Sequence, residues 1–447
     1  MAAPLTETAT VIPRGRDDKP NAWLNRFAWL TCVATLLLIC SGGMVTSKGV
    51  GLAVPDWPTT FGYNMFLFPV SKWVGGILFE HTHRLWASMV GLLVVVLTRW
   101  LGGYTSRRPL AIVGALETLA GLLIFALWPD QKATGGFLTG IGAVVLLAAL
   151  VWVQNQASSR PLPQLGWLVF ALVQLQGLLG GLRVTMLKDE IGVFHACVAQ
   201  AFLGLLVFIA LATTSFWRSF GVRGHVRAFA NGDMSPQAKI ALLKMLAVAI
   251  TTTIYVQLAL GATMRHQHRD LSILDFPTAN GAWLPDTSAA ALAKINAWRE
   301  AHALSDVTAF QIWLQMGHRF LALAIAIAII VFSLRVFRSA RTRPRFESGD
   351  MSPHSKVPAP ASTPFHWLRR LSIWWAIFLF LQITLGAWTI WSNKAADVAT
   401  AHVAMGALML SFGVMISAIC WRVVAVSRQQ ARGGSEPDRR SALPISA

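Results

Sequence analysis

The chain of 447 residues is 55% hydrophobic and only 13% charged, and its mean hydropathy is +0.54. These values exclude an ordinary soluble domain and favour a protein whose main solvent is the lipid bilayer. The formal net charge of +18 is not enough to predict a nucleic-acid partner, because Lys and Arg are concentrated in alternate segments between the apolar stretches.

About ten apolar stretches along the chain are long enough to cross a hydrocarbon core as helices. They lie near 24–46, 77–100, 109–128, 135–156, 164–184, 190–217, 239–264, 309–337, 367–392 and 398–421. We therefore expect an all-α polytopic membrane protein. The stretches at 109–128 and 135–156 are Gly-rich, and the first of them contains Glu117.

The distribution of basic residues predicts the topology. Segments on one side of the membrane hold more Lys and Arg than those on the other, which is the pattern of cytoplasmic loops. This places the tails at 1–23 and 422–447 and the linker at 218–238 in the cytoplasm. Residues 1–20 show no secretory signal, so a bacterial inner (plasma) membrane is the predicted location.

The two halves of the chain resemble one another, in the order helix end, Pro-containing loop, and helix start with histidine. The matching segments are Cys40–Thr46, Val54–Thr59 and Glu80–Arg84 in the first half, and Leu260–Arg265, Leu274–Thr278 and Gly317–Phe320 in the second. The order continues with Gln174–Leu182 before the helix of His195, and with Leu381–Ala387 before the helix of His402. This repeat predicts two four-helix bundles related by a pseudo-twofold axis along the membrane normal.

The repeat also predicts the division of the chain. The N-terminal bundle extends over 24–217 and the C-terminal bundle over 239–421, while a helix pair within 105–160 has no counterpart in the second half. We interpret this pair as a peripheral insert. Glycines such as Gly42, Gly180 and Gly386 allow either close helix packing or room for a flat ligand, and the sequence leaves both readings open.

Four of the 11 histidines recur at equivalent positions of the two halves, namely His83, His195, His318 and His402. Each lies within about two turns of the start of a helix that begins at the outer face. The two imidazoles of each half therefore lie at similar depth on different helices, as needed to hold a porphyrin iron from both sides. Zinc is less favoured because no Cys or carboxylate completes a ligand set in the second bundle. A proton pathway is an alternative, although it does not require paired histidines twice.

The halves differ beside the first histidine of each pair. Glu80 lies on one helix face with His83 and Arg84, whereas the equivalent residue beside His318 is Gln315. Only the first bundle thus has a carboxylate beside its predicted iron. This difference suggests that the reaction takes place in the first bundle and that the second bundle serves it. A simple Glu80 to Arg84 salt bridge is compatible with that role.

Other polar residues near these motifs have more than one interpretation. Arg84 and Arg319 follow their histidines directly and are candidates to pair with haem propionates. His81 points away from His83 around the helix, and we expect it to be an interfacial polar residue. The outer loops around Asp56 and Asp275 have two interpretations, as loops that cover a substrate and as ordinary interfacial turns.

Taken together, these motifs resemble the haem A synthase family. The resemblance rests on Gly43-Met-Val-Thr46, Pro55-Asp-Trp-Pro58, Glu80-His-Thr-His-Arg84, Gln176-Gly-Leu-Leu-Gly-Gly-Leu-Arg-Val184, His195 with Ala199-Gln200, and the sites of His318-Arg319 and His402. It extends over about 24–421 outside the 105–160 insert. Members of the family normally have eight spans, and some carry cysteine pairs in their loops, which this chain lacks.

The resemblance implies oxidation of the C8 methyl group of haem O to the formyl group of haem A, with oxygen derived from water. It implies a haem b cofactor between His318 and His402, a substrate haem at His83 and His195, and Glu80 as the catalytic carboxylate. A haem O synthase as partner, the electron acceptor and a homo-oligomer are left open. The competing interpretation is a non-enzymatic bis-haem cytochrome that passes electrons from quinol; a repeat-built transporter would require broken helices and midplane charges.

Overall fold

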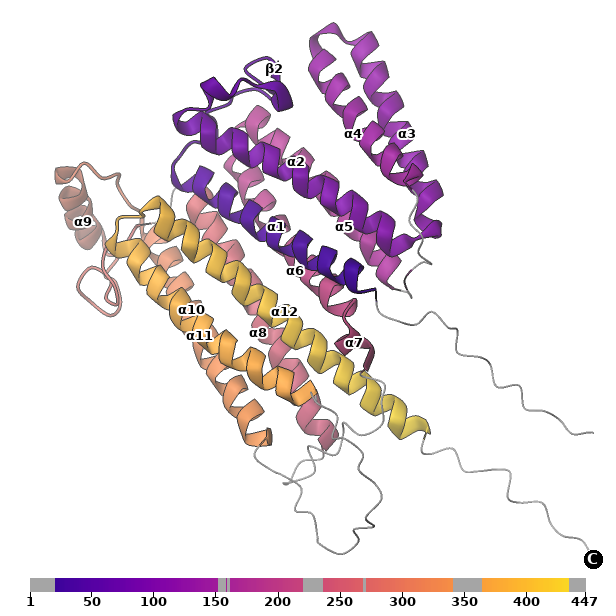
Figure 1. The fold of residues 1–447 in the computed structure, drawn as a ribbon. Helices are drawn as coiled ribbons and strands as arrows, with labels where there is room; N and C mark the ends of the chain where they lie inside the picture. Colours follow the sequence, from indigo (N-terminus) through magenta and orange to yellow (C-terminus); the bar gives the residue numbers. More distant parts are fainter. Residues whose placement is uncertain are drawn as a thin grey trace, which may run out of the picture.

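The computed structural model describes residues 21–151, 158, 161–219, 236–267, 271–340 and 364–433 (Figure 1). Residues 1–20, 220–235 and 434–447 of the predicted cytoplasmic segments lie outside this set. Within it, ten helices are long and apolar enough to cross a membrane. The predicted all-α polytopic membrane fold is confirmed.

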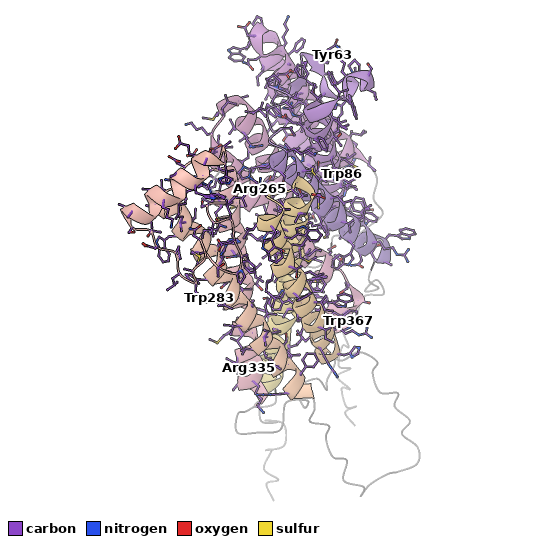
Figure 2. The ribbon with its side chains drawn as sticks, turned by 90° about the vertical axis from the view of Figure 1, so that its left-hand side faces the viewer. Tyr63, Trp86, Arg265, Trp283, Arg335 and Trp367 are labelled. Carbon is purple, nitrogen blue, oxygen red and sulfur yellow. The ribbon has the colours of Figure 1, made fainter. Side chains whose placement is uncertain are left out.

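The long helices run roughly along one common direction. They are α1 (Ala22–Ser47), α2 (Gly75–Gly102), α3 (Tyr104–Leu127), α4 (Lys132–Leu150), α5 (Leu162–Met186), α6 (Asp189–Ala212), α8 (Pro236–His266), α10 (Ala309–Ala340), α11 (Pro364–Trp391) and α12 (Ala396–Gly433). The shorter elements are β1 (Thr59–Thr60), β2 (Tyr63–Asn64), η1 (Met65–Leu67), η2 (Val70–Lys72), η3 (Pro129–Gln131), α7 (Ser215–Ser219) and α9 (Ala289–Ala301). Figure 2 shows Tyr63 near one end of the molecule and Arg335 near the other.

Several helices differ from the expectation. The sixth span ends at Ala212, and α7 follows as a separate short helix. Helix α12 continues to Gly433, beyond the predicted end at 421, because the basic segment contains mostly good helix formers. Helix α9 was not expected; it lies in the loop between α8 and α10, one of the two loops predicted to lie at the outer face and called outer loops below. The Ser288 side chain caps its start by accepting a hydrogen bond from Ala291 N at 3.3 Å.

The helices form two rings of four. In the first ring α1 packs on α2, α2 on α5, α5 on α6 and α6 on α1; in the second, α8, α10, α11 and α12 repeat the same order. The rings meet where α1 packs on α12 and α6 packs on α8 and α12. One buried apolar cluster, which includes Trp375 and Phe332, fills the second ring, and another, which includes Leu97 and Leu206, fills the first.

The inserted helices α3 and α4 form a hairpin that packs mainly on itself (Figure 1). Four glycines, namely Gly114, Gly121, Gly135 and Gly142, make this packing so close that an added Cβ would lie within 2.8 Å of the partner helix backbone. Only glycine fits such contacts, as in other close helix pairs in membranes. These glycines therefore have a packing role.

Each outer loop contains the same aspartate-centred turn. The Asp56 carboxylate accepts hydrogen bonds from the Thr59 hydroxyl, and from Phe61 N and Gly62 N at 2.8 Å each. In the second half Asp275 accepts equivalent bonds from Thr278, Asn280 and Gly281. Gly62 and Gly281 have positive φ values of 77° and 81°, which favour glycine.

These two aspartates make the turns sensitive to acid. Burial disfavours the charged carboxylates, but the hydrogen bonds outweigh it and hold the pKa of Asp56 and of Asp275 below the usual range. A carboxyl group with a lower pKa in the folded state adds stability above its unfolded pKa of about 3.9 and loses it as the pH falls through the folded pKa. We expect both turns to keep their protection from hydrogen exchange between about pH 7 and 5 and to lose it below about pH 4.

Mass-spectrometric hydrogen exchange, corrected for the intrinsic effect of pH, measures this loss. Asp56→Asn should open the first turn at all pH values and leave the turn of Asp275 titrating as before. Equal protection of both turns in the variant and the parent at neutral pH would contradict the assignment.

Candidate functional site

One continuous cavity of about 1590 Å³ contains every residue that the sequence singled out as a site residue. It extends through both helix rings near the outer loops, and its lining includes Glu80, His83, Arg84, His195, Gln315, His318, Arg319 and His402. Pockets for single drug-sized ligands are about 300–1,000 Å³. The cavity is therefore larger than one such pocket, and it holds both histidine pairs.

Each of the four imidazoles faces a glycine of the neighbouring helix. A Cβ added at Gly42 would lie 3.0 Å from His83 Cε1, and one added at Gly386 would lie 3.0 Å from His402 Cε1. The corresponding distances are 3.7 Å for Gly180 to His195 and 3.4 Å for Gly261 to His318. These four glycines leave space for the imidazole rings of the neighbouring helices.

The imidazoles also share an unsatisfied nitrogen. The Nδ1 atoms of His83, His195, His318 and His402 are buried and have no hydrogen-bond partner within the part of the chain that the structure describes. Buried polar atoms are normally paired, so four unpaired nitrogens at equivalent positions mark these imidazoles as candidate ligand-binding groups. Among the described residues there is no cluster of three or more His, Cys, Asp or Glu that would hold a lone metal ion. Paired imidazoles facing a large cavity fit an iron porphyrin better.

Three of the four glycines are preceded, one helical turn earlier, by a glutamine that sequence reasoning did not single out. Gln176 Nε2 donates to the His195 carbonyl at 3.2 Å, and Gln257 Nε2 donates to the His318 carbonyl at 2.9 Å. Gln382 Nε2 lies 3.4 Å from His402 Nε2. The spacing Gln-x-x-x-Gly on the preceding helix was the available signal, and the first helix departs from it with Leu38.

Glu80 and Gln315 occupy equivalent places but have different partners. Glu80 is 4% exposed; its carboxylate accepts from Val54 N at 2.9 Å and from Arg84 Nη2 at 2.6 Å. Gln315 accepts from Ile273 N at 2.9 Å and donates to the Ile273 carbonyl at 3.0 Å. Both side chains fasten an outer loop, and only Glu80 adds a negative charge to the cavity wall.

The two arginines also hold the loops. Arg84 donates to the carbonyls of Asp56, Thr59 and Val54 at 2.6, 3.0 and 2.7 Å, besides its ion pair with Glu80. Arg319 donates to the carbonyls of Thr278 and Asp275 at 2.8 and 2.7 Å. The terminal nitrogens of both guanidinium groups thus donate hydrogen bonds to loop carbonyls. Pairing of these two arginines with haem propionates stays a prediction.

Two other arginines of the cavity wall were missed. The guanidinium group of Arg183 lies against Gly51, where an added Cβ would be 2.8 Å from its Nη1, and it makes no hydrogen bond to another described residue. Arg265 of α8 crosses between the rings and donates to the Gly43 carbonyl and the Ser47 hydroxyl of α1. The placement of Arg265 depends on how the rings meet, and that of Arg183 on how α5 packs against the loop after α1. No local motif reveals either contact.

His81 is fully buried, and the expected interfacial position is wrong. Its Nδ1 lies 3.1 Å from the Thr60 hydroxyl, and its ring packs against Phe68 and Trp73. The side chain does point away from His83, but the folded outer loop covers that side of α2. Its polar nitrogen is thereby used to hold the loop.

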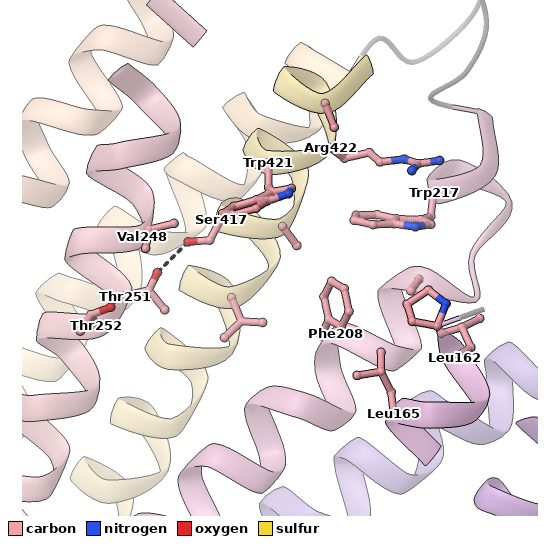
Figure 3. Close-up of a pocket in the computed structure, with 15 residues that line it drawn as sticks. Leu162, Leu165, Phe208, Trp217, Val248, Thr251, Thr252, Ser417, Trp421 and Arg422 are labelled. Atoms are coloured by element: carbon pink, nitrogen blue, oxygen red, sulfur yellow. Dashed lines mark hydrogen bonds between the residues drawn. The ribbon is translucent and has the colours of Figure 1, made fainter. Parts of the chain in front are cut away.

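A second cavity, of about 640 Å³, lies between α5, α6, α8 and α12 and is lined by none of the predicted site residues (Figure 3). Its wall carries Trp217, Trp421 and Arg422, and the guanidinium carbon of Arg422 lies 5.5 Å from the Trp217 ring centroid. Thr251 and Ser417 form a hydrogen bond at 3.0 Å on the opposite side. None of the described residues that line this cavity is a histidine or carries a carboxylate, so these residues offer neither axial ligands nor a carboxylate as proton acceptor.

Comparison with known proteins finds relatives that are haem A synthases. A family model described as "Cytochrome oxidase assembly protein" matches residues 134–353. A protein named "Heme A synthase" from Rhizorhabdus wittichii is 25% identical over 408 residues, covering 89% of this chain and 94% of the relative. The chain is thus similar to haem A synthases over most of its length.

Two further haem A synthases show the same relation. The protein from Shouchella clausii is 24% identical over 323 residues, covering 71% of this chain and 78% of the relative. The one from Rhodopseudomonas palustris is 22% identical over 392 residues, covering 87% and 88%. The family resemblance predicted from the histidine motifs is therefore confirmed.

The glycines opposite the histidines give a direct test of the site. Gly386→Leu should displace the His402 imidazole and lower the haem content of the purified protein, because the added Cβ already contacts the ring at 3.0 Å. Gly317→Leu, next to His318, is the matched control, since a Cβ there meets nothing within 4 Å. The measurement is the amount of haem per chain, taken from the Soret absorbance. An equal loss of haem in both variants would contradict the assignment of the imidazole site.

Proposed function

We propose that the protein oxidises the C8 methyl group of haem O to the formyl group of haem A in the bacterial inner membrane, with both termini in the cytoplasm. The family supports an enzyme of haem A biosynthesis that works with haem in a membrane. The observation that carries the proposal is the asymmetry of the cavity. Both rings present an imidazole pair, and only the first ring has a carboxylate beside it.

In this proposal His318 and His402 hold a haem b cofactor. The fit rests on their buried unpaired nitrogens and on the space that Gly261 and Gly386 leave for their rings. When bound there, the haem b supplies one-electron redox chemistry. Gln315 is neutral and bonded to the backbone of Ile273, so this part of the wall offers no base.

The substrate haem O lies between His83 and His195, where imidazoles from α2 and α6 fix its position. Conversion of a methyl group and one water to a formyl group releases four protons and four electrons. Glu80 lines the cavity on the turn before His83 and is placed to accept protons as the methyl carbon loses them. The outer loop fastened by Glu80 and Arg84 keeps bulk water away from that carbon.

The substrate carboxylates are proposed to meet Arg183. Haem propionates are anionic and need a cationic partner, and the planar guanidinium group suits them. Arg183 lines the cavity without a recorded hydrogen-bond partner among the described residues, whereas the terminal nitrogens of Arg84 already donate to loop carbonyls. A partner that delivers haem O, such as a haem O synthase, and an electron acceptor complete the reaction.

Expression with a haem O source tests the proposal. Haems extracted from the purified wild-type protein and from its membranes should include haem A or hydroxylated haem O. Their absence, with haem O present, would reject the enzymatic function and favour the bis-haem cytochrome. That alternative predicts reduction of both haems by quinol and no change in the extracted porphyrins.

A further inference from the structure

The inserted hairpin forms a wall of the substrate side of the cavity. The residues of α4 that line the cavity include Phe137, Gly140, Ile141 and Val144, whose spacing places them on one helix face. No described residue of α3 lines it. The insert is therefore part of the cavity, in contrast to its interpretation as merely peripheral.

An apolar groove runs between this face of α4 and the first ring. The opposite side consists of residues of α2 and α5, including Met89, Leu92 and Leu178. These side chains do not close the groove by packing together, since Val144, Leu92 and Leu178 remain 42%, 48% and 51% exposed. The groove belongs to the same continuous cavity as His83 and His195.

The hairpin contacts the first half of the chain at both ends of the groove. At the outer end the rings of Phe137 and Trp57 lie 5.6 Å apart. At the other end Val145 and Ala149 of α4 join a buried cluster with Val95 and Phe170. Between these contacts, Glu117 of α3 accepts a hydrogen bond from Gln174 of α5 at 2.5 Å. These contacts fix the hairpin against the first ring on both sides of the groove.

The groove starts at the level of the imidazoles. The Trp57 ring packs on Gly181, which is next to the glycine that faces His195. From Phe137 to Val144 the helix rises about 10 Å away from this level. An apolar chain attached to a porphyrin between His83 and His195 would therefore find a continuous apolar path along α4.

We propose that this groove binds the long isoprenoid chain of haem O. The inference rests on the proposed function. Haem b has no such chain, and in the described part of the second ring, where haem b is proposed to lie, no hairpin corresponds to α3 and α4. Burial of an apolar chain is favourable by about 0.8 kcal/mol per methylene group, so the groove selects substrate over haem b.

The test uses the full chain expressed with both haem b and haem O available. Gly140→Phe fills the groove from a position where a Cβ meets nothing within 4 Å, and Val144→Phe fills it farther along α4. Ala143→Phe is the matched control, because Ala143 is an exposed residue of α4 that does not line the cavity. Extracted haems are separated by chromatography, and all isoprenoid-bearing haems are counted together, relative to haem b.

We expect Gly140→Phe and Val144→Phe to lower the ratio of isoprenoid-bearing haem to haem b about tenfold, since losing contact with two methylene groups already has that effect. Ala143→Phe should keep the wild-type ratio, and haem b per chain should not fall in any variant. An unchanged ratio, or an equal loss of haem b, would overturn the inference and leave the proposed function standing. A wild-type protein that retains no isoprenoid-bearing haem would instead reject the proposed function.

Discussion

Glu80→Gln is expected to retain bound haem and to form product at least about 100-fold more slowly, the usual contribution of a general base. The glutamine keeps the size of the side chain and can still accept the hydrogen bond from Val54 N, but it cannot take up protons from the substrate methyl group. The measurement is the rate of appearance of hydroxylated haem O and haem A per unit of bound haem.

The matched control is Glu190→Gln, which makes the same change at an exposed position of α6 outside the cavity. It should leave the rate unchanged. Wild-type rates in Glu80→Gln would exclude the carboxylate from the chemistry. Loss of haem together with product would show that Glu80 acts only by holding the outer loop through Val54 and Arg84.

Replacement of His402 by glycine should remove the haem proposed to be held by the second ring and stop product formation. The imidazole lies in the cavity wall with a buried unpaired nitrogen, so the substitution leaves a space of imidazole size at the proposed haem site. We expect roughly half of the haem per chain to be lost, because the first ring keeps its own pair. Added imidazole should restore the low-spin Soret spectrum.

Recovery of the spectrum with imidazole would show that the variant lost an iron ligand. A variant that lost haem because its helix packing was destabilised would not recover in this way. His302→Gly, at the exposed end of α9, is the control and should keep all its haem. Full haem content in His402→Gly would remove the basis for assigning a ligand to the second ring.

Much of this protein follows from its sequence alone. The spans are predictable because a bilayer demands long apolar helices, and the observed bounds agree closely for most of them. The histidine repeat is visible because matching helices of the two halves have a histidine at the same position near their start. The contrast of Glu80 with Gln315 is equally local, since residues three and four apart share a helix face.

Tertiary structure alone decided which partners these residues meet. Arg84 and Arg319 donate to loop carbonyls, His81 is buried beneath the outer loop, and Arg183 faces the cavity. Helical periodicity determines the face on which a residue lies, but not what packs against that face. For the same reason the sequence showed that an extra helix pair exists, and only the packing of its two helices against the first ring showed that α4 lines the cavity.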